Sequence, residues 1–302
     1  MSALDRLVTL SIPMVPKPIV RRISARYIAG ETLDDAIRVV SDLNRAGAMA
    51  TLDVLGEDVF ERKQCTETVD DYLRVLDAIV AKKLDCNISI KATAFGLKLD
   101  LGFCHENIER LLRAAHERGI FVRIDMEDSS VTTVTFDLFR KFRERFPKIG
   151  PVMQAYLRRS LTDAHELLKL APLNIRLCKG IYKEKPDVAF QDREVVRKSY
   201  ANILEVLMRA GAYVGIATHD ESCVYEGLRI ADALALPREA YEFQMLLGVL
   251  PNLRKTLIDG GHRLRVYVPF GRHWYAYSRR RLNENPAIAG YVFKALLSAN
   301  VQ

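Results

Sequence analysis

The sequence has few of the features that mark a secreted, membrane-spanning or disulfide-bonded protein. Its 302 residues include five cysteines, an odd number without C-x-x-C spacing, which argues against a disulfide framework or a zinc finger. No apolar run approaches the roughly 18 to 20 residues of a spanning helix. The longest uncharged stretch near the start, residues 7–16, contains two prolines and leads to no secretory cleavage site. We therefore expect a cytoplasmic protein.

The short motifs that hold nucleotides and metals are also missing. No G-x-G-x-x-G follows the first apolar run, and there is no P-loop. The six histidines show neither H-x-x-x-H nor H-x-x-E-H spacing, so we expect no metal site. The formal net charge is +7, which favours anionic ligands or an anionic membrane surface. The basic residues are scattered and do not form a stripe with interleaved aromatics, so we expect no nucleic-acid partner.

Eight short apolar runs recur along the chain, each followed by a turn and a segment with helical apolar spacing. The runs look nearly continuous, which is typical of parallel strands covered by helices. Eight such strands close a barrel, so the sequence predicts an α/β fold, a (βα)₈ TIM-type barrel. The runs are residues 48–55, 87–93, 121–127, 151–157, 174–180, 213–220, 241–248 and 264–271.

Helix signals fill the segments between the runs. Residues 105–118 and 194–210 have apolar stripes, and each segment is followed by a glycine. Thr32 and Asp35 resemble a capping box that would start a helix before the first run. No linker or change of composition indicates a second domain. We predict one domain over residues 1–302, with a short N-terminal helical arm at 1–47 and the barrel and terminal helices at 48–302.

Seven of the eight runs become polar near their C-terminal ends. Catalytic groups lie at that end in barrels of this type, so these residues would share one rim. One polar residue there could simply be re-entering solvent, whereas seven polar strand ends together favour a binding mouth. The residues are Lys91, Asp125, Glu127, Gln154, Arg176, Lys179, Thr218, His219, Asp220, Gln244 and Tyr267.

A charged and aromatic stripe follows the eighth run. Tyr277, Arg280, Arg281 and Glu284 would share one helical face, with Glu284 able to orient both arginines. The face could be a solvated basic surface. It could equally be a paired-guanidinium clamp for a carboxylate, with Tyr277 as an apolar wall. Cys178, inside the fifth run, is interpreted as a small core residue and not as a nucleophile.

Four motifs in register resemble proline dehydrogenase in its short monofunctional bacterial form. They are NIRLCKGIY at 174–182, ATHD at 217–220, EFQML at 242–246 and YVPFG at 267–271, followed by the stripe. The resemblance runs from about Tyr27 to the last helix. It implies a barrel that carries FAD at its mouth and oxidises L-proline to Δ1-pyrroline-5-carboxylate by hydride transfer to the flavin, the first step of proline catabolism to glutamate.

The resemblance also implies roles for individual residues. The catalytic set would be Lys91, Asp125, Arg176 and Tyr267. Around the substrate would lie Lys91, Tyr182, Leu246, Tyr277, Arg280, Arg281 and Glu284, with the lysine and the arginine pair on the carboxylate. The flavin would be contacted or supported by Gln154, Arg176, Lys179, Thr218, His219 and Gln244. Arg176 would stabilise the negative charge of the reduced flavin.

The family implies a membrane quinone as electron acceptor and pyrroline-5-carboxylate dehydrogenase as a possible partner. A basic chain could then touch the inner face of the cytoplasmic membrane peripherally. A length of 302 residues leaves no room for the aldehyde dehydrogenase domain of bifunctional members. The residues alone leave two alternatives open: a Schiff-base aldolase using Lys91 or Lys179, and a non-catalytic amino-acid-binding barrel. Both alternatives predict a colourless protein.

Overall fold

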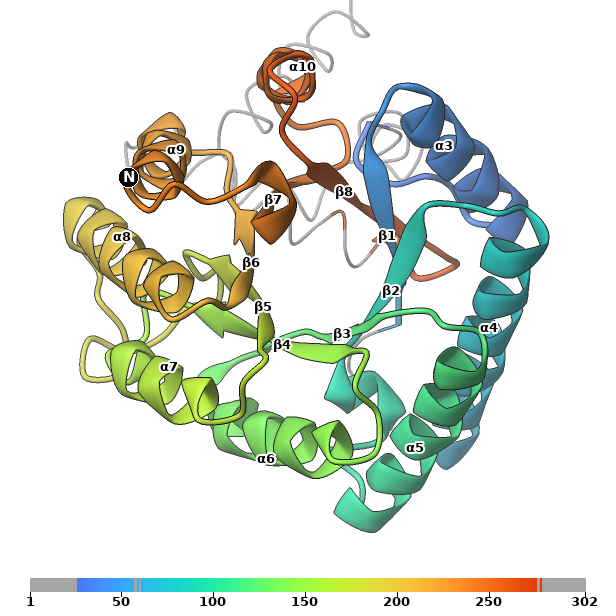
Figure 1. Cartoon of the computed structure of the whole chain (residues 1–302). Helices are drawn as coiled ribbons and strands as arrows, with labels where there is room; N and C mark the ends of the chain where they lie inside the picture. The colour runs from blue at the N-terminus through green and yellow to red at the C-terminus, as the bar shows by residue number, and fades with distance from the viewer. Residues whose placement is uncertain (1–25, 57–58, 60, 276–277, 279–302) are drawn as a thin grey trace, which may run out of the picture.

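The predicted barrel is confirmed by a computed structural model that describes residues 26–56, 59, 61–275 and 278. Within these ranges eight parallel strands form a closed ring in chain order, and β1 pairs with β8 to close it (Figure 1). The strands are β1 (Met49–Val54), β2 (Cys86–Ile90), β3 (Val122–Ile124), β4 (Ile149–Gln154), β5 (Asn174–Cys178), β6 (Tyr213–Ala217), β7 (Tyr241–Leu246) and β8 (Leu264–Phe270).

Helices surround the ring on its outer side (Figure 1). In the described part of the chain, none of them is both long and apolar enough to cross a bilayer. They are α3 (Leu33–Arg45), α4 (Arg62–Ala81), α5 (Leu101–Glu117), α6 (Thr132–Arg143), α7 (Ser160–Leu168), α8 (Arg193–Arg209), α9 (Glu221–Ala233) and α10 (Pro251–Asp259). Short 3₁₀ turns are η2 (Ala92–Phe95), η3 (Ser129–Val131) and η4 (Arg238–Ala240).

Side-chain caps fix where the helices begin. The capping box before α3 is present: the Asp35 amide donates to Thr32 Oγ1 and the Thr32 amide to Asp35 Oδ2, both at 3.2 Å. Helix α5 begins at Leu101, before the predicted start at residue 105, because the Asp100 carboxylate accepts a bond of 2.7 Å from the Phe103 amide. The sequence prediction overlooked this cap.

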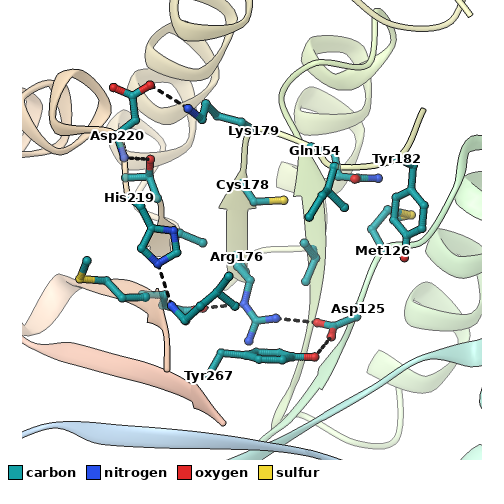
Figure 2. Close-up of a pocket in the computed structure, with 18 of the residues that line it drawn as sticks. Asp125, Met126, Gln154, Arg176, Cys178, Lys179, Tyr182, His219, Asp220 and Tyr267 are labelled. Atoms are coloured by element: carbon teal, nitrogen blue, oxygen red, sulfur yellow. Dashed lines mark hydrogen bonds and ion pairs between the residues drawn. The ribbon is translucent and has the colours of Figure 1, made fainter. Parts of the chain in front are cut away.

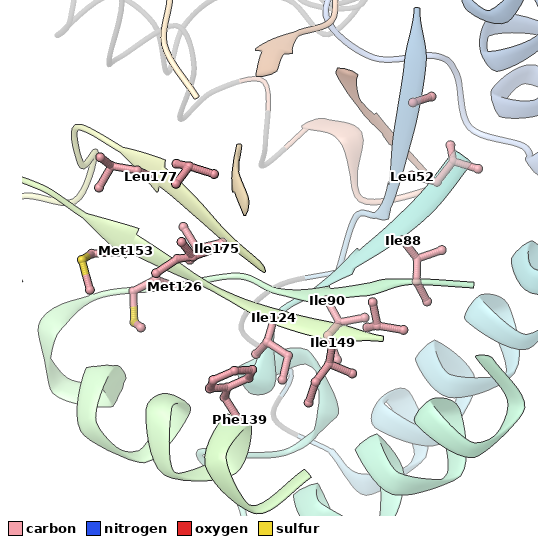
Figure 3. Packing of buried hydrophobic residues seen from close by; sticks show 14 of the residues in the cluster. Leu52, Ile88, Ile90, Ile124, Met126, Phe139, Ile149, Met153, Ile175 and Leu177 are labelled. Atoms are coloured by element: carbon pink, nitrogen blue, oxygen red, sulfur yellow. The ribbon is translucent and has the colours of Figure 1, made fainter. Parts of the chain in front are cut away.

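The strands alternate in polarity, which corrects the interpretation of their runs as nearly continuous apolar segments. Outward-facing side chains such as Leu52, Ile88 and Ile124 are fully buried and pack between the barrel and its helices (Figure 3). Successive residues of a strand point to opposite faces, so the residues between them point into the barrel. Polar residues on these inward positions are Thr51, Asp53, Asn87, Ser89, Arg123, Asp125, Gln154, Arg176, Glu242, Gln244, Arg265 and Tyr267.

Candidate active site at the C-terminal ends of the strands

A cavity of about 830 Å³ opens at the C-terminal ends of strands β2 to β8. Every predicted site residue within the described ranges lines it, as Figure 2 shows for most of them. These residues are Lys91, Asp125, Gln154, Arg176, Lys179, Tyr182, Thr218, His219, Gln244, Leu246 and Tyr267. Groups far apart in the sequence therefore meet in one place. The stripe of Tyr277, Arg280, Arg281 and Glu284 lies outside the described residues and stays a prediction.

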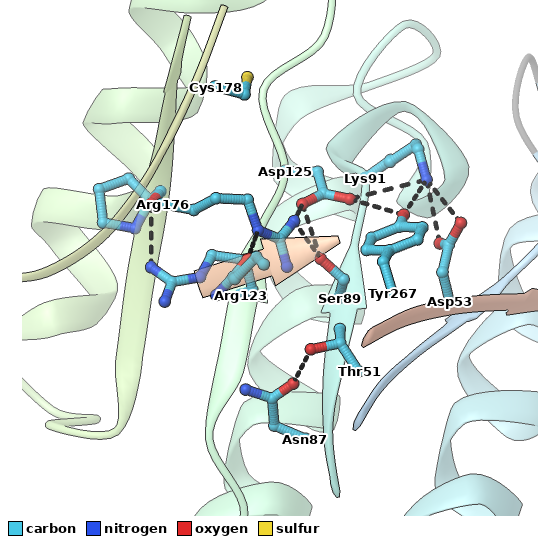
Figure 4. Close-up of polar contacts among 12 residues, drawn as sticks. Thr51, Asp53, Asn87, Ser89, Lys91, Arg123, Asp125, Arg176, Cys178 and Tyr267 are labelled. Carbon is cyan, nitrogen blue, oxygen red and sulfur yellow. Dashed lines mark hydrogen bonds and ion pairs between the residues drawn. The ribbon is translucent and has the colours of Figure 1, made fainter. Parts of the chain in front are cut away.

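Arg176 lies across the barrel interior beneath this cavity (Figures 2 and 4). Its Nε donates to Gln244 Oε1 at 2.5 Å, and its Nη1 donates to Asp125 Oδ1 at 2.5 Å and to Ser89 Oγ at 3.3 Å. The guanidinium lies 5.2 Å from the centre of the Tyr267 ring. Its Nη2 has no hydrogen-bond partner among the described residues. The group is therefore oriented from three strands and keeps one donor for a ligand.

Lys91 is held by a carboxylate that the sequence analysis missed. Its Nζ lies 3.0 and 2.9 Å from the two oxygens of Asp53, which is on β1 and only 1% exposed. The same Nζ donates to Tyr267 Oη at 3.2 Å and lies 3.8 Å from Asp125 Oδ2 (Figure 4). The first run was interpreted as apolar throughout. Its polar residues Thr51 and Asp53 stand two apart, and this spacing was the signal for a shared inward face.

Tyr267 connects the lysine to the acidic centre. Its hydroxyl accepts from Lys91 and donates to Asp125 Oδ2 at 2.9 Å. Burial, followed by the negative charges of Asp125 and Asp53, raises the pKa of Tyr267 well above its ordinary value. The phenol therefore stays protonated at neutral pH and acts as a hydrogen-bond donor.

On the opposite wall, Asp220 organises the cations. Its Oδ2 accepts from Lys179 Nζ at 2.7 Å and from Arg197 Nε at 2.8 Å, and its Oδ1 caps α9 through the Ser222 amide. Burial by itself raises the pKa of Asp220, but the hydrogen bonds from Arg197 and Lys179 outweigh it and lower the pKa to about 2. The carboxylate is therefore ionised at neutral pH.

Backbone contacts hold two further predicted residues. His219 Nε2 accepts from the Leu246 amide at 2.9 Å, so the neutral ring carries its proton on Nδ1. Gln154 Nε2 donates to the Glu127 carbonyl at 2.9 Å. Glu127 was predicted to lie on the rim, but its side chain does not line the cavity. Its carboxylate instead accepts hydrogen bonds from the amide and the hydroxyl of Thr93.

The end of β5 depends on a glycine. Gly180 has φ +114°, and a Cβ there would lie 2.1 Å from the Tyr156 ring, so the chain can follow this path into the mouth only without a side chain. Cys178, expected in the core, packs against the core and also forms part of the cavity wall. Burial raises the pKa of its thiol to about 11, which keeps it protonated and a poor nucleophile. Among the residues described, no cluster could hold a metal ion.

Comparison with known proteins decides the family. The model of the family described as proline dehydrogenase matches residues 36–293. Proline dehydrogenase 1 of Bacillus subtilis subsp. natto is 36% identical over 272 residues, which cover 90% of each chain. The proline dehydrogenase of Deinococcus radiodurans is 38% identical over 282 residues, covering 91% of this chain and 90% of the relative. The chain belongs to the proline dehydrogenase family. It resembles the monofunctional members and is an oxidoreductase.

Solved structures of larger proteins share the barrel. Proline utilization A from Bdellovibrio bacteriovorus, inactivated by N-propargylglycine, matches with a TM-score of 0.82 and 26% identity over 88% of this chain. Proline utilization A from Corynebacterium freiburgense has a TM-score of 0.78 at 20% identity over 96% of this chain, which shows the shared fold. This chain spans 33% and 34% of those two chains, so it corresponds to about a third of each.

Proposed function

We propose that this proline dehydrogenase family member oxidises L-proline to Δ1-pyrroline-5-carboxylate, with FAD bound in the cavity. One observation carries the proposal: residues predicted from separate motifs line a single cavity at the strand ends. Its volume of about 830 Å³ is in the range of cofactor and small-molecule sites, about 300 to 1,000 Å³. The chemistry of the lining residues supports both occupants.

The wall around β4 to β7 fits a flavin. Lys179 and Arg197 are cations that can face a diphosphate, while Gln154 and Thr218 offer neutral polar groups. FAD supplies a two-electron acceptor when bound. The Nη2 donor of Arg176, unused by the described residues, supports a role beside that acceptor, because a fixed cation stabilises the negative charge that reduction brings. Asp125 and Gln244 keep this guanidinium in place.

The wall around Lys91 and Tyr267 fits proline. The amino acid is a zwitterion, so its site needs cations for the carboxylate and an apolar slot for the ring. Lys91 supplies one cation, and we propose that Arg280 and Arg281, held by Glu284, supply the fork that grips both oxygens. Tyr182, Leu246 and Tyr277 would enclose the ring. Fixing the substrate carbon against the cofactor is the main catalytic contribution of such residues.

The contacts of the two lysines weigh against the aldolase. A Schiff-base lysine must be neutral to attack a carbonyl. Lys91 instead faces Asp53 at 2.9 Å and Asp125 at 3.8 Å, and Lys179 faces Asp220 at 2.7 Å. Each lysine is thus engaged in an ion pair, an arrangement that suits the binding of an anion and not attack on a carbonyl.

We propose further that the electrons pass to a membrane quinone and that the chain works in the cytoplasm, touching the anionic leaflet peripherally. The formal net charge of +7 supports this contact. Co-sedimentation with anionic vesicles, lost with neutral vesicles or high salt, is the expected result; sedimentation equal with both vesicle types would contradict it. The product would pass to a pyrroline-5-carboxylate dehydrogenase, the second enzyme of the route to glutamate.

The visible spectrum of the purified protein tests the proposal against its alternatives. We expect a yellow protein with FAD bound, or one that takes up added FAD stoichiometrically. A colourless protein that does not bind added FAD would contradict the proposal. Borohydride trapping of a carbonyl substrate on Lys91 or Lys179 would then identify the aldolase, and proline binding without trapping would identify the amino-acid binder.

A further inference from the structure

Gln244 is held between two side chains of opposite charge. Its Oε1 accepts from Arg176 Nε at 2.5 Å, and its Nε2 donates to Glu242 Oε1 at 2.6 Å. A guanidinium has only donors and a carboxylate only acceptors, so a single orientation of the amide satisfies both neighbours. The amide is therefore a polar connector whose direction is set by what lies on each side.

Glu242 is itself anchored from the opposite end of the barrel. Arg265 donates to it through Nε at 2.7 Å and Nη2 at 3.2 Å, and Tyr213 Oη donates to its Oε2 at 2.8 Å. The carboxylate is 2% exposed. Burial raises the pKa of Glu242, but the charge and hydrogen bond of Arg265 and the bonds from Tyr213 and Gln244 more than compensate and leave the pKa lowered. Glu242 is therefore an ionised and strictly accepting neighbour.

The barrel leaves little room for another position of the Gln244 amide. Gly215 on β6 lies against it, and a Cβ at Gly215 would be 2.4 Å from Gln244 Nε2. Glu242 and Arg265 border a separate hollow at the N-terminal ends of the strands and do not line the active-site cavity. Gln244 is the side chain that joins them to Arg176 by hydrogen bonds.

We propose that Glu242, anchored by Arg265, is a positioning residue that fixes the Gln244 amide and thereby the direction of Arg176 under the cavity. The inference rests on the proposed function, in which Arg176 stabilises the reduced cofactor. Its consequence is that a carboxylate outside the cavity controls how readily the bound flavin accepts electrons.

Replacing Glu242 by glutamine disturbs this arrangement even though the shape is kept. The new amide has one oxygen, which cannot serve Arg265 on both nitrogens and Gln244 together. One donor is then turned towards another donor. Where that donor is Gln244 Nε2, a flip of its amide satisfies residue 242 but points the NH₂ at Arg176 Nε, so either orientation leaves two donors face to face and the guanidinium loses its fixed direction.

Three variants test the proposal. For each one we would measure the flavin content, the flavin midpoint potential and the rate of anaerobic flavin reduction at saturating L-proline. Glu242→Gln should keep flavin, move the potential to a more negative value and slow reduction on the order of tenfold, the size of one lost hydrogen bond to a charged group. Glu242→Met/Arg265→Met removes the whole buried pair, so it should fold well and show the same two changes. Tyr213→Phe removes only the bond on the other carboxylate oxygen and should leave potential and rate unchanged.

Two results would overturn the inference. One is a stable Glu242→Met/Arg265→Met variant with the wild-type potential and rate. The other is a crystal structure of that variant in which Gln244 Oε1 still meets Arg176 Nε. A wild type that binds no flavin, or is not reduced by proline, would contradict the proposed function instead, and the crystal structure would still decide the positioning role.

Discussion

The side chains of Lys91 and Asp53 are nearly buried, with 11% and 1% exposed. Both carboxylate oxygens of Asp53 accept hydrogen bonds from the Lys91 ammonium group. Taking a charged pair out of water is costly, and the pair is tolerated because each group compensates the other. Lys91 therefore has a structural role in addition to the role in carboxylate binding that we propose for it. Its replacement should therefore affect both stability and substrate binding.

We predict that Lys91→Met weakens proline binding, leaves flavin bound and lowers the free energy of unfolding by about 3 kcal/mol, because it removes the cation facing a buried carboxylate. Adding Asp53→Asn should recover much of the stability but none of the proline affinity. Urea unfolding and proline titration of the single and double variants measure the two effects. Equal stability of Lys91→Met and wild type would show that the pair contributes nothing to the fold.

Asp220 gives the protein a defined response to acid. A pKa of about 2 in the folded state lies below the ordinary value of 3.8, so its contribution is fully present above pH 3.8 and is lost as the pH falls through about 2. The difference corresponds to about 2 kcal/mol. Replacement by asparagine keeps a good helix cap for α9 while removing the charge.

We predict that Asp220→Asn flattens the decline of stability between pH 5 and pH 2, because the variant has no such contribution to lose. Urea unfolding at several pH values measures the slope. Asp42→Asn is the control, since its exposed ion pair with Arg45 should contribute a few tenths of a kcal/mol at most. Parallel curves for wild type and Asp220→Asn would show that Lys179 and Arg197 do not stabilise this carboxylate.

At the scale of elements, the connection that leaves β5 carries Lys179 and Tyr182 into the mouth. Gly180 allows this path because Tyr156 occupies the space of a side chain. Gly211 provides a matched comparison, since it has φ +77° and a Cβ there would meet no described atom within 4 Å. The two glycines share a positive φ and differ in what surrounds them.

We predict that Gly180→Ala displaces the loop and lowers the flavin content of the purified protein, because Tyr156 or the chain must move. Gly211→Ala should cost only about 1 kcal/mol of backbone strain and keep full flavin. The ratio of flavin to protein absorbance, with urea unfolding alongside, separates the effects. Full flavin in Gly180→Ala would mean that this loop does not shape the cofactor site.

Helices and strands were predictable where local signals act alone. Thr32 and Asp35 form their box within four residues, and the outward apolar side chains of each strand mark its position. The start of α5 was missed because the Asp100 cap precedes a glycine and a phenylalanine that do not suggest a helix. The predicted C-terminal ends were too late for all eight strands, and β2 and β3 end before the rim residues Lys91 and Asp125.

Over the whole molecule, charges inside the barrel form a connected stack that sequence alone could not reveal. Arg265 with Glu242 lies at one end, Arg176 with Asp125 in the middle, and Lys91 with Asp53 at the mouth. Members of each pair come from different strands, so their partnership exists only after the strands have come together. The motifs identified the residues at the rim of the barrel. The ion-pair partners Asp53, Glu242 and Arg265 could be recognised only from the alternation of inward-facing and outward-facing positions along the strands.

The hydrophobic layer lies outside this stack, between the strands and helices (Figure 3). Stability and chemistry are thereby separated: the outer layer buries apolar surface, and the inner one orients charges. Polar residues of the barrel interior line the active-site cavity at one end and a separate hollow at the other, and the predicted site residues within the described ranges line the former. We propose that this cavity brings proline and a flavin together.

Anaerobic titration of the FAD-loaded protein with L-proline tests this proposal. We predict that proline bleaches the oxidised flavin absorbance, that glutamate does not, and that Δ1-pyrroline-5-carboxylate appears in equal amount. Oxidised flavin that persists in the presence of excess proline would contradict it.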